Sequence, residues 1–96
     1  MWTTGYFLTI VLYALAMESE IDELTAKIAT ELRVARERMA GRRPSGPDLA
    51  KAAKVSAMAI GRYMNGERAI PVPTFILICN AIGVSPGSIL DAAMKQ

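Results

Sequence analysis

The stretch GPDLAKAAKVSAMAIGRYMNG, residues 46–66, predicts two short helices separated by a tight turn. Ser45 is the expected N-cap of the first helix, with Asp48 at the capping-box position, and Ser56 is the expected N-cap of the second. The dipeptide Asn65-Gly66 stops the second helix. We therefore expect helices at about residues 46–53 and 57–64.

The apolar residues of this stretch have the spacing that two steeply crossing helices require. Such helices need a small residue where they touch, apolar inner faces and an apolar residue in the turn. Ala50 is the small residue, and Val55 lies in the turn. The inner faces are formed by Leu49, Ala53, Ile60 and Tyr63.

A longer helix is predicted upstream of these two. Ser19 is its expected N-cap, and Gly41 and Pro44 end it. Its apolar residues recur at spacings of three and four, which places them on one face. They are Ile21, Leu24, Ile28, Leu32, Ala35 and Met39.

Two further helices are expected downstream. Pro71 and Pro73 open one at about residues 74–82, and Ser85 caps another at about residues 86–95. No segment shows the alternation of a strand. The chain is therefore expected to be all-α, with five helices joined by short connections.

Residues 1–17 carry no charge and are almost entirely apolar from Gly5 onward. The run is shorter than the roughly 20 apolar residues of a spanning helix, and it has no basic flank, so a membrane is not the expected partner. Three interpretations stay open: a membrane anchor, an element that packs on the domain or on a second chain, or functionless sequence upstream of a true start at Met17. The expected division is 1–17 for this hydrophobic segment and 18–96 for the folded domain.

The composition excludes several classes of site. The 96 residues include no His and one Cys, so neither a Cys/His zinc site nor an intramolecular disulfide can form. The lone Cys79, within an apolar run, suits a reducing cytoplasm. With no His and no recognisable acidic pair, the chain is not expected to be an enzyme or to use a metal or cofactor.

Charge is distributed unevenly along the chain. The net charge is −4 over residues 1–32, +6 over residues 33–68 and zero over residues 69–96. A basic middle third between acidic and neutral ends indicates a surface that binds a polyanion. The alternative is a solvated face rich in arginine, which charge alone does not separate from the first interpretation.

Residues 32–91 resemble the phage-repressor (Xre-like) helix-turn-helix family. The resemblance is carried by LAKAAKVSAMAIGRYMNGERAIP (49–71) and PTFILICNAIGVSPGSIL (73–90), which agree with the family in helix lengths and turn residues. It implies a five-helix lambda-repressor-like domain that binds operator DNA, here with an extra hydrophobic N-terminal segment. The recognition helix in the major groove would be the one capped by Ser56 and ending at Met64.

The resemblance places the base contacts on the outer face of that helix: Ser56, Ala57, Met58, Gly61 and Arg62. Ala57 and Met58 stand where the family commonly has polar residues, so they are expected to touch thymine methyl groups. Gly61 lets the backbone lie close to the DNA. Hydrogen bonds to bases are left mainly to Arg62 and Ser56.

Phosphate contacts are expected around the recognition helix. The amide end of the preceding short helix suits a phosphate. Basic and polar side chains near the same face would hold the flanking DNA backbone. The residues are Arg42, Arg43, Ser45, Gly46, Lys51, Lys54, Asn65 and Arg68.

Two positions depart from the family pattern. Lys54 stands where the family usually has Gly, because the backbone there tends to be left-handed, and a Lys in that conformation costs roughly 1 kcal/mol. Met64 stands where the family often has an acidic residue paired with an Arg on the first helix. Arg36 is therefore expected to be free.

The helix at 74–82 has two apolar faces. One face should join the core and carries Phe75, Ile78, Cys79 and Ile82. Ile76 and Leu77 lie on another face, which is covered either by the N-terminal run or by a second copy of the chain. A homodimer would therefore use Ile76 and Leu77, or the N-terminal segment.

The resemblance implies a sequence-specific, DNA-binding transcriptional regulator, of the phage or prophage immunity repressor type. It would occupy an operator in double-stranded DNA and block polymerase without a cofactor. The self-cleaving peptidase domain of larger phage repressors is not expected after the fifth helix. Two alternatives stay open: the antitoxin of a toxin–antitoxin pair, which resembles the same family, and a membrane-tethered regulator that uses residues 1–17.

Overall fold

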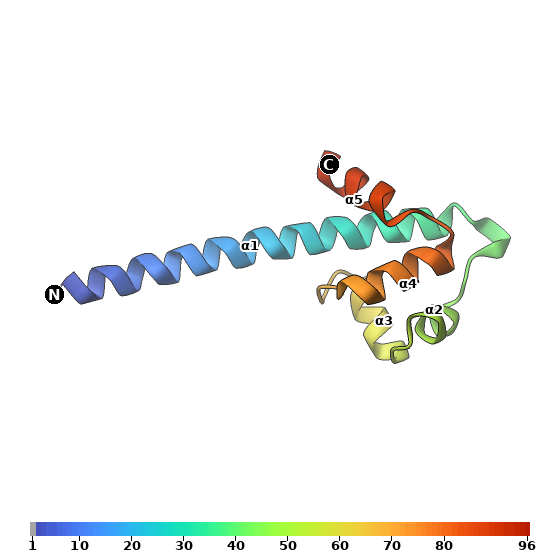
Figure 1. Ribbon diagram of the computed structural model, residues 1–96, viewed down its shortest axis with the longest axis horizontal. Helices are drawn as coiled ribbons and strands as arrows, with labels where there is room; N and C mark the ends of the chain where they lie inside the picture. The colour runs from blue at the N-terminus through green and yellow to red at the C-terminus, as the bar shows by residue number, and fades with distance from the viewer. Residues whose placement is uncertain (1) are drawn as a thin grey trace.

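The computed structural model describes residues 2–96, apart from the side chains of residues 2–4, 18 and 19. In this part of the chain all regular structure is helical, as predicted. The elements are α1 Trp2–Glu37, η1 (a short 3-10 helix) Ala40–Arg42, α2 Gly46–Ala53, α3 Ala57–Met64, α4 Val72–Ile82 and α5 Pro86–Lys95. Figure 1 shows α1 as a long rod whose C-terminal half carries α2, α3 and α4 on one side and α5 on the other.

Helix α1 is longer at its start, and shorter at its end, than predicted. The predicted start at Ser19 is wrong, because the chain is helical from Trp2 onward; the side chain of Ser19 itself lies outside the described residues. The upstream run contains no proline, so no residue in it forces the helix to stop. The helix ends at Glu37, ahead of Gly41, and Ala40 then adopts a left-handed backbone with φ 50°.

The serine N-caps predicted for α2, α3 and α5 are confirmed. The Ser45 hydroxyl accepts a hydrogen bond from the Asp48 amide at 3.2 Å, and the Asp48 carboxylate accepts one from the Ser45 amide at 3.2 Å, which completes a capping box. The hydroxyls of Ser56 and Ser85 each accept from the amide three residues further on, at 3.1 and 3.3 Å. These local bonds position the starts of the three helices.

Helix α4 starts earlier than predicted. It begins at Val72, with Pro71 before it and Pro73 in its first turn, instead of at Thr74. Proline fits there because the first turn of a helix needs no amide donor.

Three helices end in the same kind of left-handed turn. The backbone φ is 59° at Lys54 after α2, 74° at Gly66 after α3 and 84° at Gly83 after α4. In each turn the amide of the following residue bonds back to the helix: Val55 to the Ala50 carbonyl at 3.0 Å, Glu67 to Arg62 at 2.9 Å and Val84 to Cys79 at 3.0 Å. The left-handed conformation predicted at Lys54 is thus confirmed, and its Cβ costs about 1–2 kcal/mol.

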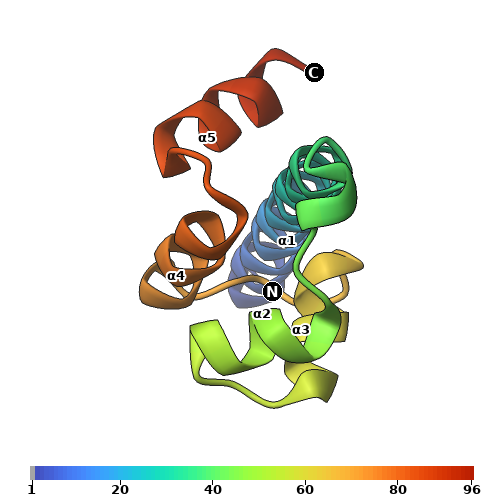
Figure 2. The same ribbon diagram turned by 90° about the vertical axis from the view of Figure 1, so that its right-hand side faces the viewer.

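One apolar core joins the C-terminal half of α1 to the other helices. Leu32 of α1, Leu49 of α2 and Ile78 of α4 are completely buried. Figure 2 shows α2 and α3 at one end of this domain, α5 at the other and α4 between them, all beside α1. The core face predicted for α4 is confirmed, since all four of its members are buried: Phe75, Ile78, Cys79 and Ile82.

The N-terminal half of α1 extends away from this core. Every described side chain in the range 5–17 is exposed, with Tyr13 at 68%. The interpretation in which this run covers Ile76 and Leu77 is therefore wrong for a single chain; Ile76 stays exposed, and Leu77 packs partly on the core. Among the described residues no single helix is long and apolar enough to cross a bilayer, and the pair α4 and α5, which reaches that length together, is bent by 104°.

The substitution Lys54→Gly is expected to raise the free energy of unfolding by about 1 kcal/mol, because glycine adopts the left-handed backbone without a Cβ clash. Urea unfolding followed by circular dichroism measures the change. Lys54→Ala is the matched control, since it removes the same charge but keeps a Cβ, and it should give no gain. Equal stabilisation by both variants would mean that charge, not backbone strain, is relieved.

Candidate nucleic-acid interface

Helices α2 and α3 pack together through small and apolar side chains. Ala50 and Ala53 on α2 are buried, as are Ile60 and Tyr63 on α3, and Val55 packs against the core from the turn. These are the residues that the sequence spacing assigns to the contact. The turn reverses the chain between the two helices, so α3 is held with one face inward and the other toward solvent.

The outward face of α3 is an open surface with one long polar side chain. Met58 is 70% exposed, Ala57 and Arg62 are also exposed, and Gly61 is half-buried. A Cβ built on Gly61 would meet nothing within 4 Å, so this glycine leaves the helix backbone accessible. The Ser56 hydroxyl accepts the cap hydrogen bond and keeps its own proton for donation to a partner.

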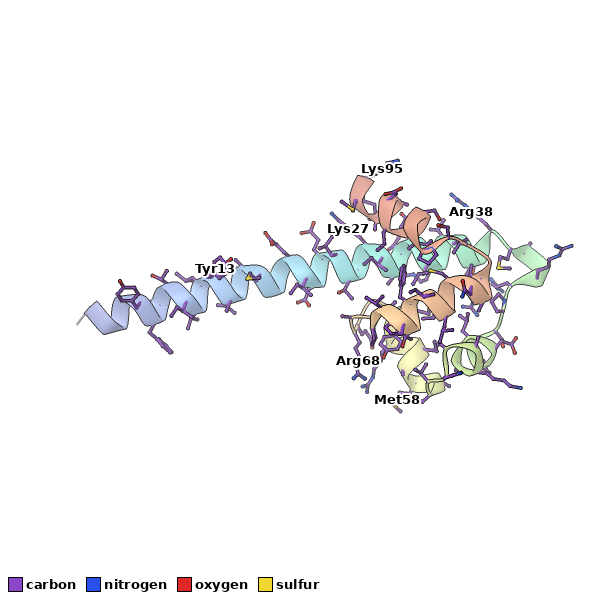
Figure 3. All side chains as sticks on the ribbon, viewed as in Figure 1. Tyr13, Lys27, Arg38, Met58, Arg68 and Lys95 are labelled. Carbon is purple, nitrogen blue, oxygen red and sulfur yellow. The ribbon has the colours of Figure 1, made fainter. Side chains whose placement is uncertain are left out.

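Four exposed cations lie on α2, α3 and the turns beside them. They are Lys51, Lys54, Arg62 and Arg68. Within the described part of the chain, no ion pair engages any of them. Figure 3 places Met58 and Arg68 at the same edge of the molecule, whereas Arg38 and Lys95 lie toward the opposite edge. The edge formed by α3 therefore combines an exposed helix face with positive charge that is available to an anion.

Arg42 and Arg43, two of the residues predicted to contact phosphate, lie away from this edge. Arg42 lines a shallow hollow with Ile82 and Val84, and no residue of α2 or α3 lines that hollow. Arg43 donates to both carboxylate oxygens of Glu37 at 2.6 and 2.7 Å. The structure thus does not group these two arginines with the outer face of α3.

The N-terminus of α2 already holds a carboxylate. Ser45 and Gly46 lie at this end, where Asp48 accepts the hydrogen bond from the Ser45 amide. The carboxylate supplies the negative charge that a helix N-terminus favours, so a phosphate placed there would meet a like charge. The exposed cations are better placed for phosphate contacts than this end of α2. Asn65 is exposed at the other end of the unit, as the C-cap of α3.

Sequence reasoning missed Arg33, which ties α1 to the end of α3. Its Nη1 donates to the Met64 carbonyl at 2.9 Å. The prediction that Arg36 is free is wrong, because its Nε donates to the Pro44 carbonyl at 2.8 Å. The Pro44 carbonyl therefore takes the place of the acidic side chain that the family often has where Met64 stands. The pattern of arginines on α1 gave no signal for this, since only the fold decides which carbonyl each one reaches.

The side chains that the structure describes include one thiol, that of Cys79. Among them, no group of three or more His, Cys, Asp or Glu residues is placed to hold a metal ion. Cys79 is fully buried in α4, and this burial raises the pKa of its thiol to about 11. Such a thiol stays protonated at neutral pH and is a poor nucleophile.

Comparison with known families agrees with this geometry. The family model described as helix-turn-helix matches residues 48–89, from the first turn of α2 to the first turn of α5. The matched range contains α3 and the whole of α4, and it confirms the resemblance to the Xre-like family that the sequence indicates. No match was found among curated proteins or among solved structures.

Cys79 is expected to be unreactive toward an aromatic disulfide reagent at pH 8 in the folded protein, and to react fully in urea. Burial raises the thiol pKa from 9.0 to about 11, so the folded state keeps the neutral thiol at a pH where an unfolded chain begins to ionise it. This contribution to stability is present below pH 9 and is lost as the pH rises from 9 toward 11. Rapid labelling without urea would contradict the burial of Cys79.

Proposed function

Because residues 48–89 belong to the Xre-like helix-turn-helix family, we propose that this DNA-binding transcriptional regulator is a sequence-specific repressor of the phage or prophage immunity type. The observation that carries the proposal is the exposed outer face of α3, flanked by exposed cations that no ion pair engages in the described chain. The protein occupies an operator on cytoplasmic DNA and excludes polymerase from it.

Base reading in this proposal belongs to the outer face of α3, inserted in the major groove. Ala57 and Met58 have no groups for bidentate hydrogen bonds, so they select thymine through its methyl group. Gly61 allows the helix backbone to approach the base edges, since nothing fills the space beside it. Arg62 pairs with O6 and N7 of guanine, and Ser56 donates its hydroxyl proton.

Phosphate binding belongs to the cations around that face. Lys51, Lys54 and Arg68 are exposed beside α3 and hold the DNA backbone, which positions the helix without reading sequence. Asn65 is a further donor at the end of α3. The remaining candidates are Arg42, Arg43, Ser45 and Gly46. Before Arg43 could bind a phosphate, its exposed ion pair with Glu37 would have to open. The cost is small, because exposed ion pairs contribute about 0–1 kcal/mol to stability.

DNA binding is expected to weaken steeply with salt. If about five phosphates are neutralised, the logarithm of the binding constant should fall against the logarithm of salt concentration with a slope near −4.5. The slope is measured by fluorescence anisotropy with random double-stranded DNA at several salt concentrations. A slope shallower than about −2 would show that the basic segment is not the footprint.

Arg62→Ala is expected to cost about 1–3 kcal/mol of binding free energy at the operator and to relax preference at one base pair. Arg68→Ala is the matched control, because it removes an equal charge at the same edge of the molecule. It should weaken all sequences alike and reduce the salt slope by about 1.

Each variant is titrated against a selected operator, against single-base variants of it and against random DNA. Thermal unfolding of both variants first establishes that the domain is intact. The assignment of α3 as the reading helix fails if Arg62→Ala keeps the full base preference while Arg68→Ala loses it.

A further inference from the structure

The N-terminal half of α1 carries a repeating apolar seam that the single chain leaves exposed. Apolar residues alternate at spacings of three and four, which is the period of a coiled coil. This α1 seam consists of Phe7, Ile10, Ala14, Met17, Ile21, Leu24 and Ile28. Its members from Phe7 to Leu24 are exposed, with Ile21 at 52% and Leu24 at 47%.

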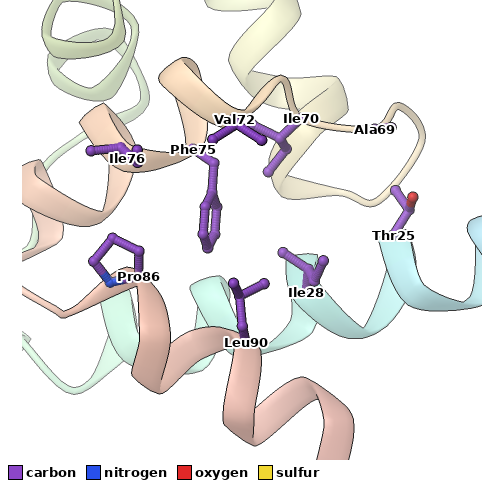
Figure 4. Close-up of a pocket in the computed structure, with 9 residues that line it drawn as sticks. All are labelled: Thr25, Ile28, Ala69, Ile70, Val72, Phe75, Ile76, Pro86 and Leu90. Atoms are coloured by element: carbon purple, nitrogen blue, oxygen red, sulfur yellow. The ribbon is translucent and has the colours of Figure 1, made fainter.

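The α1 seam leads directly into an apolar cavity. Ile28, its last member, lines a cavity of about 350 Å³ together with Phe75 of α4 and Leu90 of α5. Figure 4 shows these three side chains directed toward one another, with Ile70 and Ile76 on the same rim. The apolar surface is therefore continuous from Phe7 to the cavity, along one side of α1.

We propose that a second copy of the chain covers this surface, with the two α1 helices antiparallel. Phe7 then lies opposite Leu24 of the second copy, Ile10 opposite Ile21, and Ala14 opposite Met17. The N-terminus of each α1 reaches the mouth of the other copy's cavity. The contact is self-complementary, as a two-fold symmetric dimer requires.

The acidic segment in the middle of α1 sets the direction. In the antiparallel pair Glu20, Asp22 and Glu23 lie beside the uncharged residues 8–11 of the second copy. In a parallel pair each of these carboxylates would lie level with its own counterpart, and those of Glu20, next to the seam residue Ile21, would lie nearest to each other; Glu23 is already paired with Lys27 at 3.3 Å. Like charges held together are destabilising, so the antiparallel pair is favoured.

The pattern of the seam points to a protein partner and not to a lipid. A lipid surface would account for apolar residues up to Met17. The stripe continues at Ile21 and Leu24, however, where the neighbouring side chains are acidic instead of the Lys and Arg that membrane-surface helices carry. A coiled coil accounts for the stripe in both parts, because it buries the one apolar face that the two parts share.

The exposed surface is also large enough for a stable dimer. Eight large apolar side chains on the α1 seam or at the positions that flank it are exposed, and the three aromatic ones are each about two-thirds exposed: Tyr6, Phe7, Ile10, Val11, Tyr13, Met17, Ile21 and Leu24. Aromatic side chains bury about 150–250 Å² each. With the aliphatic side chains added, the surface is on the order of the 800 Å² per partner that specific interfaces bury.

For a protein with the proposed DNA-binding function, this dimer makes a geometric prediction. The two-fold axis of an antiparallel pair is perpendicular to the helices, so both α3 helices face one side. Gly66 and Met64 contact α1 between Ala26 and Arg33, which separates the two α3 helices by about 40 Å along the α1 axis, at 1.5 Å per residue. This is close to the roughly 34–36 Å between two half-sites that lie one turn of DNA apart. Because the dimer is two-fold symmetric, the operator is an inverted repeat.

Light scattering of the full chain in the absence of DNA tests the proposal. We expect a dimer at micromolar concentration. The double substitution Phe7→Glu with Ile10→Glu charges the α1 seam and should give a monomer. Leu8→Glu with Leu12→Glu is the matched control, since it adds the same charge to the opposite face of the same helix turns, and it should stay dimeric. Both sites are exposed and far from the core, so the domain stays folded.

Cross-linking tests the direction. Under mild oxidation, the double variant Phe7→Cys with Leu24→Cys should form intermolecular disulfides, and Phe7→Cys alone should form none. A parallel pair would link Phe7→Cys to its own counterpart. The natural Cys79 is fully buried and stays out of the reaction.

Three results would overturn the proposal. The first is a monomeric full chain. The second is equal dissociation of the seam variant and its control. The third is binding of a monomeric full chain to phosphatidylcholine vesicles, which both pairs of substitutions would weaken equally. Because no DNA is present, a failure of operator binding would leave these results unchanged.

Discussion

The turn between α2 and α3 requires a left-handed backbone at Lys54, where φ is 59°, and the orientation of α3 follows from that turn. The Val55 amide bonds back to the Ala50 carbonyl, which brings the Val55 side chain onto the core. Burial of Leu49 and Ile60 on the two sides of the turn offsets the strain of a Cβ-bearing residue. With this turn in place, the outer face of α3 points to solvent.

A second set of contacts holds α3 against α1. Gly66 passes so close to α1 that a Cβ there would lie 3.3 Å from the Cα of Ala26. Arg33 reaches from α1 to the Met64 carbonyl at the end of α3. Together they fix where the end of α3 meets α1, so the reading face has a defined position relative to the whole rod. Because α1 is one continuous helix, the position of α3 is also fixed relative to the N-terminal half of α1.

One apolar stripe runs along both halves of helix α1. Within the domain the stripe buries Leu32 and Ala35 against the other helices. On the N-terminal side of Ile28 the same stripe continues along the exposed part of the helix, because the apolar residues keep their spacing of three and four. The net charge of the chain also differs between these parts: it is −4 over residues 1–32 and +6 over residues 33–68. The acidic residues that make the first of these parts negative all lie between residues 18 and 31, so they repel DNA from the middle of α1.

The sequence by itself determined the outer face of α3 and the helices from residue 46 onward, apart from the start of α4, because caps, left-handed turns and apolar periodicity are local properties of the chain. It did not determine that α1 runs unbroken past Ser19, since an uncharged apolar run fits a separate segment as well as a longer helix. The arginines depended on the tertiary structure: Arg36 bonds to Pro44, Arg33 to Met64, and Arg43 to Glu37. A long flexible cation binds whichever oxygen the fold brings within reach. Packing of α3 on α1 brings the Met64 oxygen to Arg33 across 31 residues, and the turn after α1 brings the oxygens of Pro44 and Glu37 to Arg36 and Arg43.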